Sequence, residues 1–109
     1  MAEFIEATKE NIIELKNKYS RLLLEFSATW CGPCKVLEPM LHEITKKITD
    51  ERFAVAMVNV DNNPDLALEY DVMNVPTMVF LKDMETVDME VNVPKKSDLE
   101  NRINRFIND

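Results

Sequence analysis

Two apolar runs separated by one long helical pattern limit this chain to a small number of folds. Residues 22–27 and 53–60 are mostly apolar, as in strands that are buried on both faces of a sheet. Between these runs, from the cysteines to about residue 49, apolar residues recur at helical spacing: Leu37, Met40, Leu41, Ile44 and Ile48. Two strands joined by a helix form a right-handed parallel crossover. We therefore expect a parallel βαβ unit at the centre of the fold.

The residues on either side of this unit extend it into a layered α/β pattern. A short strand is expected at residues 4–5, and Thr8 predicts the cap of a helix that runs to about Tyr19. After the unit, the sequence predicts a short helix at 64–70 and a buried strand at 77–81. These elements give the order β-α-β-α-β.

The last part of the chain predicts a hairpin and a helix. Val87, Met89, Val91 and Val93 alternate with polar residues, which is typical of a half-buried strand, and few residues separate it from the strand before it. The two strands should pair antiparallel. A capping box beginning at Ser97 opens a helix with one apolar face: Leu99, Ile103, Phe106 and Ile107. The fold class is therefore α/β (βαβαβ-ββα), a mixed central β-sheet sandwiched by helices in one domain over residues 1–109.

The only two cysteines lie as Cys31-Gly32-Pro33-Cys34, directly after the first apolar run. A C-x-x-C pair beside a βαβ pattern indicates a redox dithiol. A zinc site would need further ligands, and the chain has a single histidine, His42, outside the usual spacing. A purely structural disulfide over so short a loop would restrain little unfolded-state entropy. We expect no metal and no cofactor apart from the redox-active disulfide itself.

Charge and hydropathy exclude several classes of function. The formal net charge is −7, and the lysines are scattered, which disfavours a nucleic-acid partner. The first 20 residues mix charged with apolar side chains and do not resemble a signal peptide, and no apolar run reaches the length of a membrane span. We expect a cytoplasmic protein, where thiols stay reduced, and a monomer, since no long exposed apolar face is visible.

The helix start should tune the two thiols differently. Cys31 lies where unpaired N–H groups and the helix dipole favour a thiolate, whereas Cys34 lies one turn further and should be more often protonated. Pro33 suits a first helical turn and stiffens the ring. Gly32 is the only glycine of the chain, and its place between the cysteines suggests that bulk or backbone freedom matters there.

Glu25 is the one carboxylate in the first apolar run. A buried carboxyl without a cationic partner should have a raised pKa. We hypothesise that Glu25 is largely protonated near neutral pH and exchanges protons with Cys34 through water. An exposed strand position is the alternative interpretation.

Several motifs together resemble the thioredoxin family along essentially the whole chain. They are Trp30-Cys31-Gly32-Pro33-Cys34-Lys35, Pro39, Asp61-Asn62-Asn63-Pro64 and Val75-Pro76-Thr77. The resemblance implies the thioredoxin fold, a Cys31 nucleophile, a resolving Cys34 and a cis peptide bond before Pro76. Family members usually carry an aspartate at Glu25 and often a lysine where this chain has Met57.

The resemblance also implies a surface that docks substrates around the cysteines. Trp30, Val75 and Pro76 are expected there, and the backbone of Val75 would pair with an extended substrate strand. Met73 and Val93 could serve either docking or the core. Asn92 stands where the family commonly has a glycine and would narrow the groove.

These features predict a thiol–disulfide oxidoreductase that reduces disulfide-containing protein substrates through the Cys31–Cys34 pair. A separate thioredoxin reductase or equivalent donor should recharge it, because no flavin or nicotinamide motif fits in the chain. Two alternatives remain open: an oxidant or isomerase, and a non-redox binding module on a thioredoxin fold.

Overall fold

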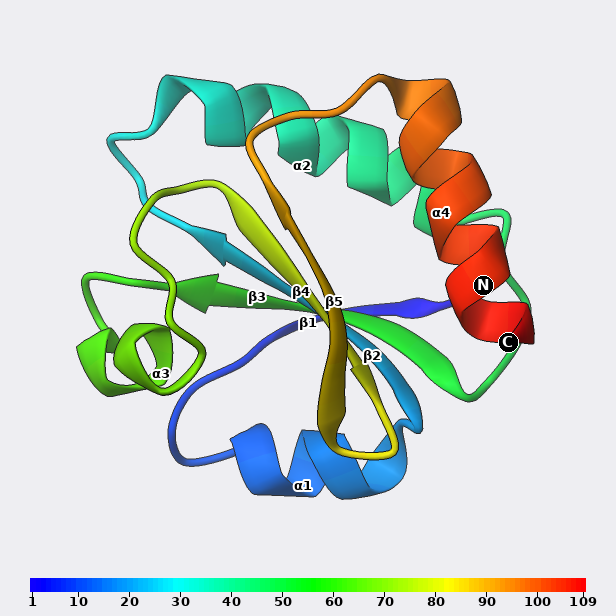
Figure 1. The fold of residues 1–109 in the computed structure, drawn as a ribbon, viewed down its shortest axis with the longest axis horizontal. Helices are drawn as coiled ribbons and strands as arrows, with labels where there is room; N and C mark the ends of the chain where they lie inside the picture. The colour runs from blue at the N-terminus through cyan, green and yellow to red at the C-terminus, as the bar shows by residue number, and fades with distance from the viewer.

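The computed structural model describes all 109 residues as a five-stranded sheet between two pairs of helices (Figure 1). In chain order the elements are β1 (Glu3–Glu6), α1 (Ile12–Lys18), β2 (Arg21–Ser27), α2 (Gly32–Thr45), β3 (Phe53–Asn59), α3 (Pro64–Glu69), β4 (Thr77–Lys82), β5 (Glu85–Val91) and α4 (Lys96–Asn108). In the view of Figure 1, α2 and α4 lie above the sheet and α1 and α3 lie below it. The expected order of elements is confirmed.

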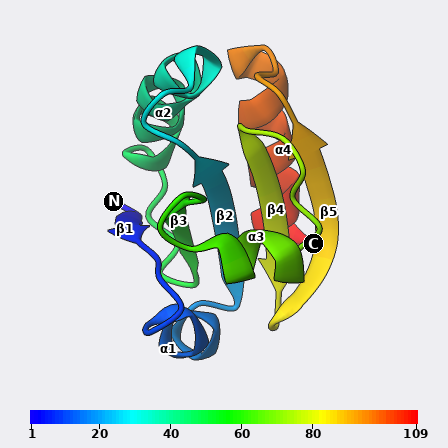
Figure 2. The same ribbon diagram turned by 90° about the vertical axis from the view of Figure 1, so that its left-hand side faces the viewer.

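The sheet is mixed, with the order β1-β3-β2-β4-β5, as the turned view in Figure 2 shows. β2 pairs in parallel with β3 and antiparallel with β4, and β4 pairs antiparallel with β5. The predicted parallel βαβ unit and the predicted hairpin are therefore both present. Because β2 is the central strand, the cysteines that follow it lie at the carboxyl end of β2, in the middle of the sheet's width.

Alternation along the central strands divides the core into two clusters. Leu22, Leu24 and Phe26 join the cluster on the α1 and α3 face, and Leu23 joins the cluster on the α2 and α4 face. All seven residues of β2 are buried, as the apolar run predicts for a central strand. Glu25 shares the face of Leu23, beneath α2.

Three helix boundaries differ from the prediction. Thr8 does not cap α1: its N–H donates to Asn11 Oδ1 (2.7 Å) in a turn, and α1 begins at Ile12. The cysteine helix ends at Thr45, four residues early. The capping box at Ser97 is absent, since α4 begins at Lys96 without a side-chain cap and Glu100 instead accepts from Lys47.

The apolar side chains that alternate along β5 were expected to be buried, but they are largely exposed. Nearly all of the strand is exposed. α4 packs against its polar side, where the guanidinium of Arg102 binds Asp88 and Glu90. Met89 pairs with Val79 on the opposite face, at the exposed rim of the α1 and α3 side, where 37% of Met89 is exposed. A register shift after Phe80 interrupts the ladder.

None of the helices combines the length and the apolar composition that a membrane span requires.

Candidate functional site

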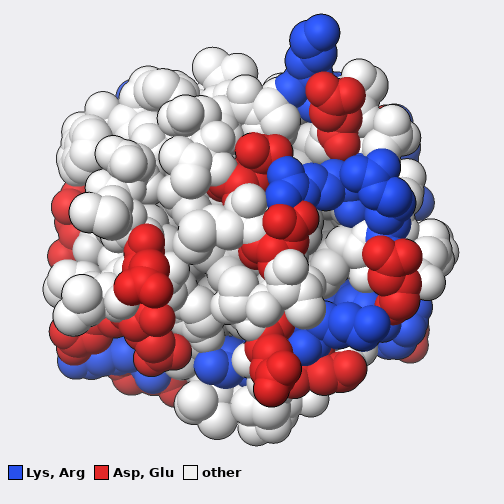
Figure 3. All heavy atoms as spheres, in the orientation of Figure 1, with Lys and Arg blue, Asp and Glu red and all other residues white.

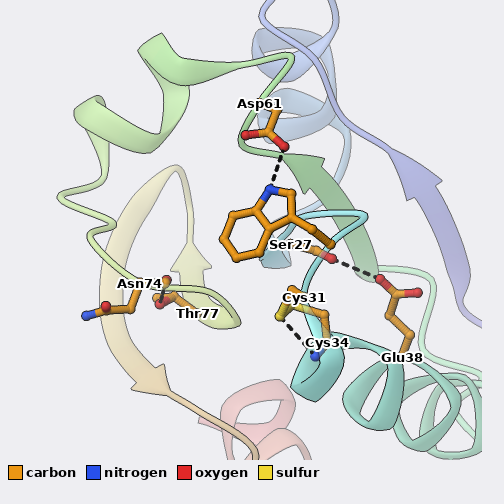
Figure 4. Close-up of a disulfide and its surroundings, with 8 residues drawn as sticks. Ser27, Cys31, Cys34, Glu38, Asp61, Asn74 and Thr77 are labelled. Atoms are coloured by element: carbon orange, nitrogen blue, oxygen red, sulfur yellow. Dashed lines mark hydrogen bonds between the residues drawn. A yellow bond between two sulfur atoms is a disulfide. The ribbon is translucent and has the colours of Figure 1, made fainter.

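The two cysteines occupy the first turn of α2 and form a disulfide (Figure 4). Cys31 is the residue before the helix, and its Sγ accepts a hydrogen bond from the N–H of Cys34 at 3.2 Å. This bond uses one of the unpaired amides at the helix start, which stabilise negative charge on Cys31 when the disulfide opens. The side chains are almost fully buried, with 3% of Cys31 and 1% of Cys34 exposed.

Gly32 does not supply the backbone freedom that its position suggested. Its φ is not positive, and a Cβ built there would meet no atom within 4 Å. Neither backbone freedom nor packing inside the protein requires a glycine. Gly32 and Pro33 are both exposed, so this turn presents a smooth surface beside the sulfurs.

Trp30 stands beside the disulfide with 68% of its surface exposed. Its indole Nε1–H donates to Asp61 Oδ2 at 2.9 Å, as the dashed line in Figure 4 shows. The loop after β2 is thereby fixed to the loop after β3. The sequence had placed Asp61 only within a family motif, and this hydrogen bond gives it a role in orienting the indole.

The Val75–Pro76 peptide bond is cis, as the resemblance implied. Pro76 is buried, and Val75 packs against the disulfide cluster formed by Ala28, Cys31 and Cys34. Thr77 Oγ1 donates to the carbonyl of Asn74 at 2.6 Å, which fixes the bend before β4. The cis peptide therefore lies next to the sulfurs.

An apolar groove of about 290 Å³ lies on this side of the disulfide. Its lining residues are Trp30, Val60, Ala67, Val72, Met73, Asn74 and Val75. Met73 is 90% exposed, which favours docking over the core for this residue. In Figure 3, the surface over the start of α2 and the chain leading to β4 carries few charged groups, whereas acidic and basic groups mix over α4.

The other expected docking residues lie outside this groove. Asn92 takes a left-handed φ of 73°, and its N–H donates to the carbonyl of Pro76 at 3.0 Å. Asn92 therefore adjoins the cis proline. Val93 is half-buried and packs against the core cluster on the α2 and α4 face.

Glu25 is completely buried, which excludes the exposed alternative. In the sheet its partners are Met57 on β3 and Met78 on β4, and neither carboxyl oxygen has a hydrogen-bond partner. Burial raises the pKa of Glu25 to about 8, and the negative charge of Glu38 adds to the rise. Glu25 is therefore a neutral acid at pH 7.

A second cavity, of about 280 Å³, adjoins Cys34. Its lining residues are Ser27, Ala28, Thr29, Cys34, Lys35, Glu38 and Asn59. At its wall the hydroxyl of Ser27 donates to Glu38 Oε1 at 3.0 Å. Sequence reasoning missed both residues, although Glu38 follows Cys34 by four positions on one helix face and Ser27 follows Glu25 by two on one strand face.

Comparisons with known proteins agree with this geometry. The thioredoxin family model matches residues 3–105. Thioredoxin H8 of Arabidopsis thaliana is 39% identical over 98 residues, which are 90% of this chain and 64% of that protein. Thioredoxin of Bacillus subtilis is 36% identical over 86 residues, which are 79% of this chain and 82% of that protein.

A solved structure shows the same fold and a similar sequence. A mutant thioredoxin from Halobacterium salinarum superposes with a TM-score of 0.86 and 30% identity, over 95% of this chain and 90% of that one. With a Cys31–Cys34 disulfide at the start of α2 and a cis Pro76 beside it, the chain belongs to the thioredoxin family, whose members are thiol–disulfide oxidoreductases.

Proposed function

We propose that this thiol–disulfide reductase acts on protein disulfides, with Cys31 as nucleophile, Cys34 as resolving thiol and Glu25 as the proton donor and acceptor. The observation that carries the proposal is the disulfide at a helix start, with Val75 of an apolar groove packed against it and a buried acid on the strand that leads to it.

Substrate reduction takes place in two exchanges. The Cys31 thiolate attacks one substrate sulfur, forms a mixed disulfide and releases the other substrate sulfur as a thiolate, which takes a proton. Cys34 then loses its proton and attacks Cys31 Sγ. The Cys31–Cys34 bond forms, and the second substrate sulfur leaves as a thiolate. The two electrons of the dithiol have then passed to the substrate.

Glu25 serves both directions of this cycle. In the disulfide form its carboxyl is protonated, so it can donate to the Cys34 thiolate that appears when a donor opens the bond. As a carboxylate it can take the proton back before Cys34 attacks. No protein group is hydrogen-bonded to either carboxyl oxygen, which leaves Glu25 free of competing partners for this exchange.

The groove supplies the docking surface for an extended, apolar substrate segment. Trp30, Met73 and Val75 offer apolar contacts, and the backbone of Val75 before the cis Pro76 offers hydrogen bonds to a substrate strand. Asn92 and Val93 would contact the substrate at the far side of the proline.

The proposal extends to the cellular setting. We place the protein in the cytoplasm as a monomeric electron carrier, one domain over residues 1–109, that a separate thioredoxin reductase or equivalent donor recharges. The net charge of −7 argues against a nucleic-acid partner.

The reduction potential of the Cys31–Cys34 pair tests the direction of electron flow. Equilibration with a dithiol buffer can be followed by the emission of Trp30, the only tryptophan, which stands beside the disulfide. We expect a value near about −270 mV, which is that of thioredoxin itself, rather than about −180 mV as in protein disulfide isomerase. A value near the latter would contradict the reductase and favour an oxidant or isomerase.

A further inference from the structure

Two openings flank the disulfide: the apolar groove, whose Val60 and Val75 pack against the disulfide cluster, and the cavity that Cys34 itself lines. The apolar groove and the cavity beside Cys34 share no lining residue. In Figure 4, Asn74 of the groove and Glu38 of the cavity lie on opposite sides of the disulfide. A substrate seated in the groove would cover the Cys31 side and leave the cavity open, so protons have to reach Cys34 from the cavity.

Glu25 has few routes to solvent. Its sheet neighbours Met57 and Met78 cannot carry a proton. On the α2 side, the titratable groups are Cys34 and Glu38, and Glu38 is the charged group whose field acts on Glu25. Lys35 lines the outer part of the cavity and is exposed.

The cavity is suited to water. Its volume of about 280 Å³ exceeds that of a single water molecule several times. The Ser27 hydroxyl, the Glu38 carboxylate and the Asn59 amide supply the polar partners that an ordered water needs. The hydrogen bond from Ser27 holds the Glu38 side chain at the wall of this cavity rather than in open solvent.

We propose that Glu38, held by Ser27, is the positioning residue of a proton path that joins solvent in this cavity to Glu25 and Cys34. This inference rests on the proton-transfer role of Glu25 proposed above. A donor thiolate attacks Cys31 Sγ, the Cys31–Cys34 bond breaks, and the electron pair stays on Cys34 Sγ. Glu25 gives its proton to that sulfur and regains one from cavity water oriented by Glu38. The second thiol of the donor then releases Cys31.

The charge of Glu38 has a second effect on the same step. Two neighbouring carboxyl groups resist double ionisation, so Glu38 keeps Glu25 in its acid form until the Cys34 thiolate appears. Without the charge of Glu38, Glu25 would lose its proton at lower pH and could not supply it to Cys34.

The test compares the disulfide forms of the parent, Glu25→Gln, Glu38→Gln and Glu43→Gln. Glu43 is a matched control, since it lies on α2, loses the same charge and is bound to Lys96 away from the cavity. Reduction by dithiothreitol is followed by stopped-flow Trp30 emission from pH 6 to 9, roughly the range in which shifted carboxyls and thiols titrate. Division by the rate of the control cancels the titration of the reagent. Infrared difference spectra follow the Glu25 carboxyl separately.

We expect Glu25→Gln to slow reduction at pH 7 by about a hundredfold, the lower end of what a positioned acid contributes. In Glu38→Gln, the normalised rate should fall at lower pH than in the parent, and the carboxyl band of Glu25 should disappear at lower pH. Glu38→Asp, which keeps the charge, should stay nearer the parent.

Two results would overturn the inference while leaving the role of Glu25 intact. One is a Glu38→Gln profile and Glu25 titration that overlay those of the parent. The other is a rate loss that is equal at every pH, which a merely structural role would give. A Glu25→Gln variant as fast as the parent would instead remove Glu25, and the path with it, from the mechanism.

Discussion

The buried carboxyl of Glu25 should make the stability of this protein fall as pH rises through the neutral range. The perturbation is Glu25→Gln, which keeps the shape of the side chain and removes the ionisable group. In the folded disulfide form the pKa of Glu25 is raised from 4.5 to about 8, first by burial and then by the charge of Glu38. In the unfolded chain it returns to its ordinary value.

The magnitude follows from proton linkage. Below pH 4.5 both states hold the proton, and the shift has no effect. Between pH 4.5 and about 8, the folded state holds a proton that the unfolded state has lost, so the free energy of unfolding falls by about 1.4 kcal/mol per pH unit. The loss is about 3 kcal/mol at pH 7 and about 5 kcal/mol above pH 8, where it levels off.

The assay is guanidinium unfolding of the parent and of Glu25→Gln at a series of pH values from 4.5 to 9. Both proteins keep the disulfide, so the cysteines do not titrate. The variant should gain on the parent by about 3 kcal/mol between the acid end and pH 7. Glu10→Gln, at an exposed position, controls for the loss of one carboxylate. A difference between variant and parent that stays constant over this range would refute a raised pKa for Glu25.

Two further changes test the frame around the site. Met84→Gly should stabilise the protein by about 1 kcal/mol in the same unfolding assay, because Asp83 and Met84 form a two-residue hairpin loop with φ of 49° and 76°, which a glycine adopts more easily; an unchanged midpoint would contradict this. Arg21→Met should cost about 2 kcal/mol, because the buried guanidinium donates to the carbonyl oxygens of Phe106 (3.2 Å) and Asp109 (2.8 Å) at the end of α4. A loss below about 0.5 kcal/mol, typical of a surface change, would show that water replaces these bonds without cost.

The sequence predicts the sheet well because its signal is long and redundant. Residues 22–27 and 53–60 could only be central strands, and the structure has them side by side and parallel. The disulfide at the start of α2 followed from the C-x-x-C spacing, and the cis bond before Pro76 came from the family resemblance.

Predictions that rested on one or two residues did worse. Thr8 and Ser97 have the residue types of helix caps, but a turn at Asn11 and an earlier start at Lys96 compete with them. Apolar and polar side chains alternate along residues 85–91 as expected, yet this alternation does not say which face of the strand a helix will cover. In the structure α4 covers the acidic face, because Arg102 pairs with Asp88 and Glu90 there.

The cavity beside Cys34 was missed for a different reason. Ser27 ends a strand and Glu38 lies in a helix, so their 3.0 Å contact depends on how β2 and α2 pack. Spacing alone puts Glu38 on the face of Cys34 and Ser27 on the face of Glu25. Only the packing of helix on sheet shows that these two faces meet.

The acidic edge of β5 has a consequence for crowded solutions. A strand at the rim of a sheet is an open template for another copy of the same strand. Here a second chain aligned antiparallel on Asp88 would set two Asp88 carboxylates opposite each other, and the register shift after Phe80 twists the rim out of plane. Arg102 holds these charges in place along the rim. The ion pairs of Arg102 with Asp88 and Glu90, on the polar side of β5, thus also hinder growth of the sheet into fibrils. This protection should weaken as salt screens the carboxylates.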